Sequence, residues 1–253
     1  YDYFRVMTLH VTPENREAVR TGKVDLLPVK LSEAHALFQA NSLLPIDVAL
    51  VQVSPPDKQG YCSLGVSVGY VLDVALGAGM VMAEVNEQMP KTYGKNQLHM
   101  DRFDYVVETS RPLLEYPSPE ISEIEMVVAR NVNYLIDNGS VLSIGIGAIP
   151  EAVVRTIDRK RNLGVHSGMI TDAIITPIKE KIITNKQKNI DKDRTVAALA
   201  LGTKRLFQFI DENPKVEMHP YSYTHDIKTM AQLDNLVSIN SAVEVDLTGQ
   251  INA

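Results

Sequence analysis

The stretch SVLSIGIGAIPEAVVRTIDRKR (residues 140–161) joins a strand pattern, a glycine turn and a helix pattern in direct succession. Residues 140–147 form an aliphatic run that ends in Gly145 and Gly147, and residues 149–161 have apolar positions at helical spacing. Pro150 falls near the first turn of this helix, where the missing N–H costs nothing. A strand that runs directly into a helix is the repeating unit of α/β folds.

Short β-branched runs alternate with helical patterns on both sides of this unit. Residues 47–55 and 105–109 favour strands, and residues 69–85 favour a helix, a turn and a strand. Residues 120–136 favour a helix that Asn138-Gly139 would cap. Further strands or turns are expected in LGVHSG (163–168), RTVAALALG (194–202), FIDENPKVEMHP (209–220) and NLVSINSAVEVDLTG (235–249). The alternation predicts an α/β fold with mostly parallel strands.

The segment TSRPLLEYPSPEIS (109–122) has three prolines and little periodicity, which is typical of a linker. We therefore expect two open α/β units, over residues 1–116 and 117–253. The sequence has no initiator Met and stops just after a strand-like segment. We expect the natural protein to be longer at both ends, so that residues 1–116 are the C-terminal portion of a first domain and residues 117–253 the N-terminal portion of a second.

The composition narrows the function classes. Among 253 residues, 45% are hydrophobic and the net charge is −6, with no run of Lys or Arg, which disfavours nucleic acid and anionic membranes as partners. The apolar stretches are too short to span a membrane. The single cysteine, Cys62, cannot form an internal disulfide, so a cytoplasmic location is expected. The six histidines are scattered, and no metal site is expected.

The glycine turn is the first candidate site. Backbone N–H groups and the helix dipole at such a junction attract phosphate or an oxyanion, although a plain tight turn fits the local sequence as well. Pro150 stands where the third glycine of a dinucleotide fingerprint would be, so a nicotinamide oxidoreductase is disfavoured.

Two other segments are candidates for lining a site, and a third is a charged run. The glycine- and serine-rich loop 54–70 is a structured loop able to line a cleft, with Cys62 as a packed thiol. Residues 83–96 place Asn86 and Gln88 at the end of a strand, where α/β sheets bind ligands. The charged run 179–194 favours a solvated hairpin or loop.

Five blocks, in this order, resemble the acetyl-CoA hydrolase/transferase family. They are DVALVQVSPPDKQGYCSLGVSVGY (47–70), AEVNEQMPKTYG (83–94), SIGIGAIPEAVV (143–154), LGVHSGMITDA (163–173) and INSAVEVDLTGQ (239–250). Within the family the similarity is greatest to the 4-hydroxybutyrate and butyrate:acetate CoA-transferases, and it extends over essentially the whole chain. The resemblance implies two α/β units of CoA-transferase type and a homodimer.

The resemblance also implies a chemistry, namely the exchange of coenzyme A between a short-chain acyl-CoA and a carboxylate such as acetate. A glutamate carboxylate attacks the thioester, giving an acyl-glutamyl anhydride and CoA thiolate. The thiolate returns to form a glutamyl-CoA thioester, and the second acid reverses the sequence. Backbone N–H donors stabilise each oxyanion. Acyl-CoA and carboxylate are the substrates, and no metal takes part.

Site residues follow from the matching motifs. Gly145, Ile146, Gly147, Ala148 and Ile149 match the family's CoA-binding loop, and Asn240 matches an asparagine on the CoA side. The pattern around the family's nucleophilic glutamate, H-[ST]-E-[MV]-x-x-D, corresponds here to residues 166–172, HSGMITD. Gly168 therefore stands where the family has its glutamate.

Three explanations of Gly168 are open. The protein is a CoA-binding relative without the usual chemistry, or a carboxylate comes from elsewhere, or the position carries an introduced substitution. Asp172 is discounted as a replacement because family members already have an acid there, and Glu151 is a weaker candidate because a first-turn acid usually complements the helix dipole. The activities to be separated are a CoA-transferase, a thioester hydrolase and a non-catalytic CoA-binding protein.

Overall fold

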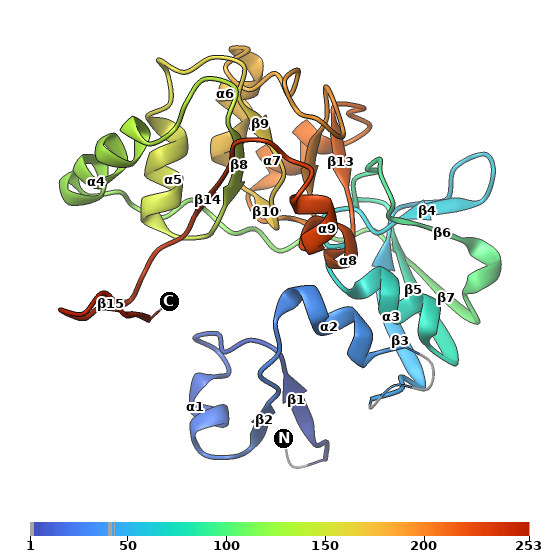
Figure 1. The fold of residues 1–253 in the computed structure, drawn as a ribbon. Coiled ribbons are helices and arrows are strands. Elements are labelled where there is room, and N and C mark those ends of the chain that lie inside the picture. Colours follow the sequence, from blue (N-terminus) through green and yellow to red (C-terminus); the bar gives the residue numbers. More distant parts are fainter. Residues whose placement is uncertain (1–2, 40–41, 43, 253) are drawn as a thin grey trace.

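The computed structural model describes residues 3–39, 42 and 44–252, so residues 1, 2, 40, 41, 43 and 253 of the two predicted units lie outside the described residues. The chain has the expected α/β architecture, with helices packed on small and mostly parallel sheets (Figure 1). The first elements are β1 (Val6–Thr8), α1 (Arg16–Arg20), β2 (Val24–Leu26) and α2 (Leu31–Leu37). β1 and β2 pair in parallel.

The first larger sheet has three parallel strands in the order β3-β5-β7. These are β3 (Val48–Val53), β5 (Met80–Asn86) and β7 (Tyr105–Thr109), and α3 (Val71–Gly77) precedes β5. The strands expected in 47–55, 69–85 and 105–109 are thus confirmed. Because successive residues of a strand point to opposite faces, one face of the sheet is buried, whereas Leu50, Tyr105 and Val107 are exposed on the other.

The second half is built on another parallel sheet, in the order β14-β8-β9. Its strands are β8 (Val141–Ile144), β9 (Gly164–Val165) and β14 (Leu236–Ile239), and its helices are α4 (Glu123–Tyr134) and α5 (Ala148–Arg155). Ser122 and Glu125 start α4 with a reciprocal capping box. α4 and α5 lie side by side (Figure 1), joined where the Asn133 amide donates to the Thr156 carbonyl oxygen at 3.0 Å.

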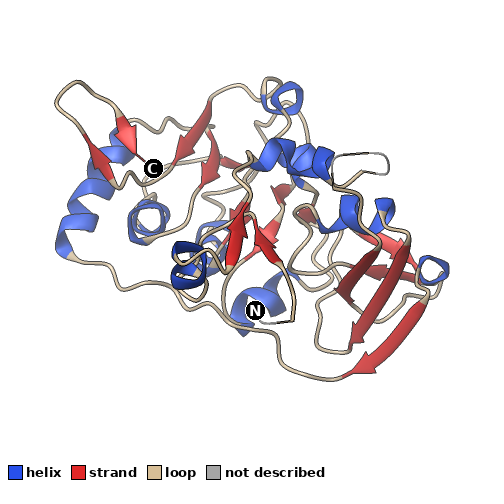
Figure 2. Cartoon of the chain, turned by 90° about the horizontal axis from the view of Figure 1, so that it is seen from below, coloured by secondary structure: helices blue, strands red, loops and turns tan. Residues whose placement is uncertain are grey.

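Short elements complete the chain. They are β4 (Tyr61–Ser63), β6 (Gln97–His99), η1 (Met100–Arg102), β10 (Met169–Ile170), η2 (Asp172–Ile174), α6 (Ile175–Lys179), β11 (Thr195–Ala197), β12 (Leu199–Ala200), α7 (Lys204–Ile210), β13 (Val216–Met218), α8 (Tyr221–Thr224), α9 (Ile227–Met230), β15 (Glu244–Val245) and β16 (Ile251–Asn252). The pairs β10-β12 and β11-β13 are parallel, and β4-β6 and β15-β16 are antiparallel. The hairpin β15-β16 projects from the rest of the chain (Figure 1, Figure 2).

The loop 54–70 joins the two halves. The N–H groups of Val68 and Gly69 both donate to the Ala198 carbonyl oxygen, at 3.0 and 3.2 Å. The Tyr221 N–H donates to the Gly69 carbonyl oxygen at 2.8 Å, so the start of α8 is attached to the same loop. Between β7 and α4, residues 110–122 form neither helix nor strand.

One local expectation was wrong, and another holds only in part. α4 ends at Tyr134 and is followed by Leu135, so Asn138-Gly139 does not cap it. Instead, Gly139 has φ +81° in a turn that leads into β8. The segment 179–194, expected to be a solvated hairpin or loop, contains Lys188 with only 1% of its surface exposed. Its ammonium group donates to the carbonyl oxygens of Val165 and Arg194, at 3.0 and 2.8 Å, which holds this loop against β9.

Burial lowers the pKa of Lys188 to about 8, from 10.5. Between these values the unfolded chain binds a proton that the folded chain has lost, so this group makes stability rise with pH through that window. At about 1.4 kcal/mol per unit, the rise is on the order of 3 kcal/mol. In Lys188→Met this rise should be absent. Urea unfolding of both proteins across the window measures the difference, and parallel pH profiles for the two would contradict the buried-lysine account.

Candidate functional site

Three segments that are far apart in sequence meet at one edge of the second sheet. β14, β8 and β9 are neighbours and run in the same direction, so their carboxyl ends lie together. Directly after these strands come Asn240, the turn Gly145–Gly147 and the loop 166–168, respectively. The carboxyl edge of a parallel sheet is where α/β proteins bind ligands.

Ser167 fixes the third segment to the second. Its hydroxyl donates to the Ile144 carbonyl oxygen at 3.0 Å and accepts from the Ile144 N–H at 2.9 Å. Ser167 is only 1% exposed, whereas the next residue, Gly168, is partly exposed. Position 168 is thereby held at the surface beside the glycine turn.

The turn itself presents backbone donors. Gly147 has φ +115°, a conformation that L-residues rarely adopt. At Gly145 a side chain would collide with the Asn240 side chain, which packs directly against this turn. The N–H groups of Ile146 and Gly147 donate to no other residue in the described part of the chain. These donors precede the N-terminus of α5, an arrangement that suits an anion or a developing oxyanion.

Gly168 has no conformational need to be glycine, because its φ lies outside the left-handed region. What a side chain would meet is the ring of His225. A Cβ at position 168 would lie 2.7 Å from Cε1 and 3.0 Å from Nε2 of that ring. The room next to Gly168 is therefore taken by an imidazole.

His225 follows α8 and is held from both sides. Its Nδ1 lies 3.0 Å from the Thr224 hydroxyl, and its ring packs edge-on against Tyr221 with the centroids 4.9 Å apart. The buried His166, in the loop that contains Gly168, contacts the Thr224 carbonyl oxygen through Nε2 at 3.2 Å. Burial lowers the pKa of His225, which favours the neutral ring. From the sequence, His225 was considered only as a possible metal ligand, because no local pattern indicates that it lies beside Gly168.

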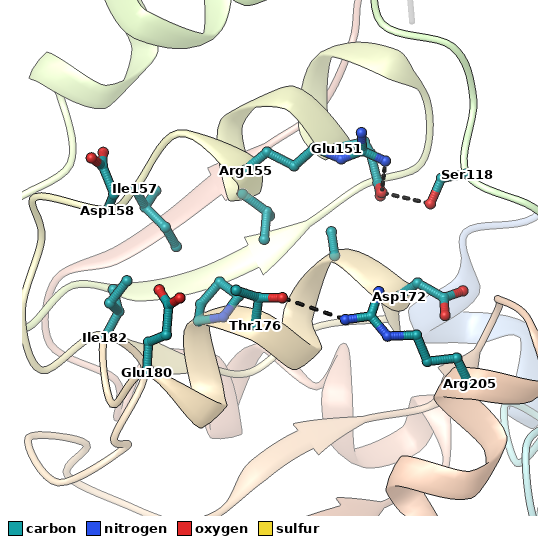
Figure 3. Close-up of a pocket in the computed structure, with 13 residues that line it drawn as sticks. Ser118, Glu151, Arg155, Ile157, Asp158, Asp172, Thr176, Glu180, Ile182 and Arg205 are labelled. Carbon is teal, nitrogen blue, oxygen red and sulfur yellow. Dashed lines mark hydrogen bonds and ion pairs between the residues drawn. The ribbon is translucent and has the colours of Figure 1, made fainter.

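The two acids considered as replacements are both fully engaged. The buried Glu151 carboxylate accepts from the Ser118 hydroxyl at 2.8 Å and pairs with Arg155 at 3.2 Å (Figure 3). It also accepts from the Thr171 hydroxyl at 2.7 Å. Asp172 accepts from the N–H and the hydroxyl of Thr203, the residue that caps α7, at 2.7 and 2.9 Å. Both carboxylates hold local structure.

A cavity of about 380 Å³ lies between these acids, with Arg155 and Arg205 also in its lining (Figure 3). The lining includes neither Gly168 nor any residue of the turn Gly145–Gly147. A hollow of about 10 Å³ adjoins the turn and shares Ser118 and Glu151 with the larger cavity.

The remaining candidate residues, Cys62 and Asn86, are buried and have structural roles. The Cys62 thiol is fully buried, its pKa is raised by burial to about 11, and its sulfur contacts that of Met100, as expected of a packed thiol. Asn86, at the end of β5, is buried and donates to the Arg111 carbonyl oxygen at 2.9 Å. Within the described ranges no helix is long and apolar enough to cross a bilayer, and no cluster of three or more His, Cys, Asp or Glu side chains could hold a metal ion.

Known proteins match this chain along its length. A 4-hydroxybutyrate coenzyme A transferase from Clostridium kluyveri is 43% identical and is matched over 98% of this chain and 58% of its own length. A butyryl-CoA:acetate CoA-transferase from Anaerostipes caccae is 34% identical over 100% of this chain and 58% of its own length. The crystal structure of a 4-hydroxybutyrate CoA-transferase from Porphyromonas gingivalis superposes with a TM-score of 0.88 at 34% identity, covering 99% of this chain and 65% of that one.

The chain thus spans less than two thirds of the length of these relatives. Two models of one family also match, the acetyl-CoA hydrolase/transferase N-terminal domain over residues 3–115 and the C-terminal domain over residues 202–253. On these similarities and on its fold, the chain belongs to the acetyl-CoA hydrolase/transferase family.

Proposed function

We propose that the protein acts on short-chain acyl-CoA, of the 4-hydroxybutyryl or butyryl type, as a CoA-transferase with a carboxylate such as acetate as the acceptor. The relatives named for these substrates support the acyl class. Coenzyme A binds at the loop formed by Gly145, Ile146, Gly147, Ala148 and Ile149, with Asn240 on the CoA side. The thioester carbonyl faces position 168.

The observation that carries this proposal is the convergence of the glycine turn, Asn240 and Gly168 at the carboxyl edge of β14-β8-β9. A thioester bound there lies within reach of the free N–H groups of Ile146 and Gly147. Such donors stabilise the oxyanion that forms when the thioester carbon is attacked.

Gly168 changes what the site can do. The covalent route needs a carboxylate at this position, and glycine has none. Neither Glu151 nor Asp172 is free to replace it, because both carboxylates are bound to neighbouring side chains. As the sequence stands, CoA transfer by the glutamyl route should therefore be slow. Thioester hydrolysis is the second candidate function, since the partly exposed imidazole of His225 faces the same position.

We further propose two structural units over residues 1–116 and 117–253, a homodimer, and a cytoplasmic location. Residues 110–122, which have no helix or strand, support the boundary. The single, buried Cys62 supports a reducing compartment. The homodimer rests on resemblance to the family alone.

Gly168→Glu should raise acetate-dependent CoA transfer from butyryl-CoA by at least about 100-fold, because it supplies the missing nucleophile. Hydroxylamine or borohydride trapping should then detect a glutamyl-CoA thioester. Gly168→Gln is the matched control, with equal size and no carboxylate, and should gain nothing. A wild-type protein that already transfers CoA as fast as Gly168→Glu would overturn the assignment of position 168.

The side chain introduced at 168 must displace His225, whose Cε1 lies 2.7 Å from the new Cβ. Gly168→Glu/His225→Ala should therefore be at least as active in CoA transfer as Gly168→Glu, and its melting temperature should be higher. Equal melting temperatures for the two variants would show that the ring moves aside at no cost.

Asn240→Ala should weaken CoA binding by about tenfold, since one hydrogen bond to a ligand is worth roughly 1 kcal/mol or more. Isothermal titration calorimetry with free CoA measures the change. Asn189→Ala makes the same substitution at an exposed asparagine beyond the sheet edge that carries the candidate site, and this variant should bind CoA as the wild type does. Unchanged affinity in Asn240→Ala would place the coenzyme elsewhere.

A further inference from the structure

The imidazole of His225 packs directly against the backbone of Gly168. Nε2 lies 3.0 Å from the point where a Cβ at position 168 would begin. Nε2 is therefore adjacent to the position that a nucleophilic side chain at residue 168 would occupy. Both residues are partly exposed, so this position opens to solvent, whereas Ser167 and His166 beside it are buried.

The contacts of Thr224 are compatible with a proton on Nδ1 of His225. In that arrangement the Thr224 hydroxyl donates to the Pro220 carbonyl oxygen, which lies 3.4 Å away and can only accept. The hydroxyl oxygen then accepts from Nδ1–H of His225, at 3.0 Å. With the proton on Nδ1, the lone pair is on Nε2. No group in the described part of the chain hydrogen-bonds to Nε2, so this lone pair is free on the side of Gly168.

The ring is also held in place. Tyr221 contacts its edge, and Tyr221 itself is bound through its N–H to Gly69. Thr224 is bound through its carbonyl to His166, in the loop that contains Gly168. The base and the position it faces are thus connected by a hydrogen bond through the protein interior. A base positioned in advance loses little entropy when the substrate arrives.

We propose that His225 is the general base of a thioester hydrolysis at this site, with water taking the place of the family's carboxylate. Resting on the proposed function only for acyl-CoA binding, the step proceeds as follows. Nε2 removes a proton from a water, the hydroxide oxygen bonds to the thioester carbon, and the carbonyl becomes an oxyanion. The oxyanion then collapses, the carbon–sulfur bond breaks, and the leaving thiolate takes the proton from Nε2. The products are a carboxylic acid and CoA, with no redox change and no co-reactant besides water.

The absence of a carboxylate at position 168 is what makes hydrolysis possible here. A carboxylate would fill the space next to Nε2 and would capture the acyl group as an anhydride. Without a carboxylate there, a water on the solvent-exposed side of the ring can stand within hydrogen-bonding reach of Nε2, roughly 2.6–3.2 Å. Hydrolysis should then proceed without any acceptor acid.

The test uses the full-length protein with butyryl-CoA and measures CoA release with a thiol reagent. Cys62, the one cysteine among these 253 residues, is buried and gives little background. We expect CoA release that does not depend on acetate. His225→Ala should lower kcat by about 100-fold or more with little change in KM, as loss of a general base does. Added imidazole should restore part of the activity, which a merely structural histidine would not show.

Two controls separate the base from its surroundings. His225→Gln fills a similar volume without a base of suitable strength and should be as slow as His225→Ala. His99→Gln, at the end of β6, should leave the rate unchanged. Thermal melts of all variants verify that they are folded.

Calorimetry with CoA tests coenzyme binding separately from the role of His225 as the base. A protein that does not bind CoA overturns the proposed function and the hydrolysis together. A protein that binds CoA but releases none from butyryl-CoA, or does so equally well in His225→Ala, overturns the role of His225 alone. Release that requires acetate also overturns it.

Discussion

The parallel pairing of β8 with both of its neighbours is the constraint on which the site depends. Because β14, β8 and β9 run in the same direction, the segments that follow them emerge at the same edge. An antiparallel β9 would place Gly168 at the opposite edge, far from the glycine turn. Ser167 adds to this constraint by bonding to both backbone groups of Ile144, where the ladder between β8 and β9 has already ended. The arrangement is thus a property of sheet topology first and of side chains second.

Much of the fold was predictable because its signals are local. The strand β8, the glycine turn and the start of α5 occur in one continuous pattern, and Pro150 marks the helix start. The end of α4 and the burial of Lys188 were not predictable. A Gly four residues beyond the helix resembles a cap in sequence, and a lysine in a charged run resembles a solvated one, until β9 packs against it. In both cases tertiary contacts, and not propensity, decided the outcome.

The residues of the candidate site likewise differ in whether the sequence could identify them. The glycine turn could be found from its own residues, and Asn240 and Gly168 only through resemblance to a family. His225 had no signal of either kind, because its position beside Gly168 results from the return of the chain through β12 and α8. Glu151 shows the opposite case. Its place in the first turn of α5 suggested a simple charge–dipole role, yet its carboxylate also accepts hydrogen bonds from Ser118, in the segment 110–122, and from Thr171.

The ordinary backbone conformation of Gly168 has a consequence for the history of this protein. Codons for glycine and glutamate can differ by a single base, so one point mutation exchanges an empty position for a carboxylate. At Gly147 the same mutation would meet a φ of +115° and distort the turn. At position 168 the ring of His225 is what stands in the way. Under the assignment proposed above for position 168, one genetic step would therefore add or remove the nucleophile while the glycine turn is preserved.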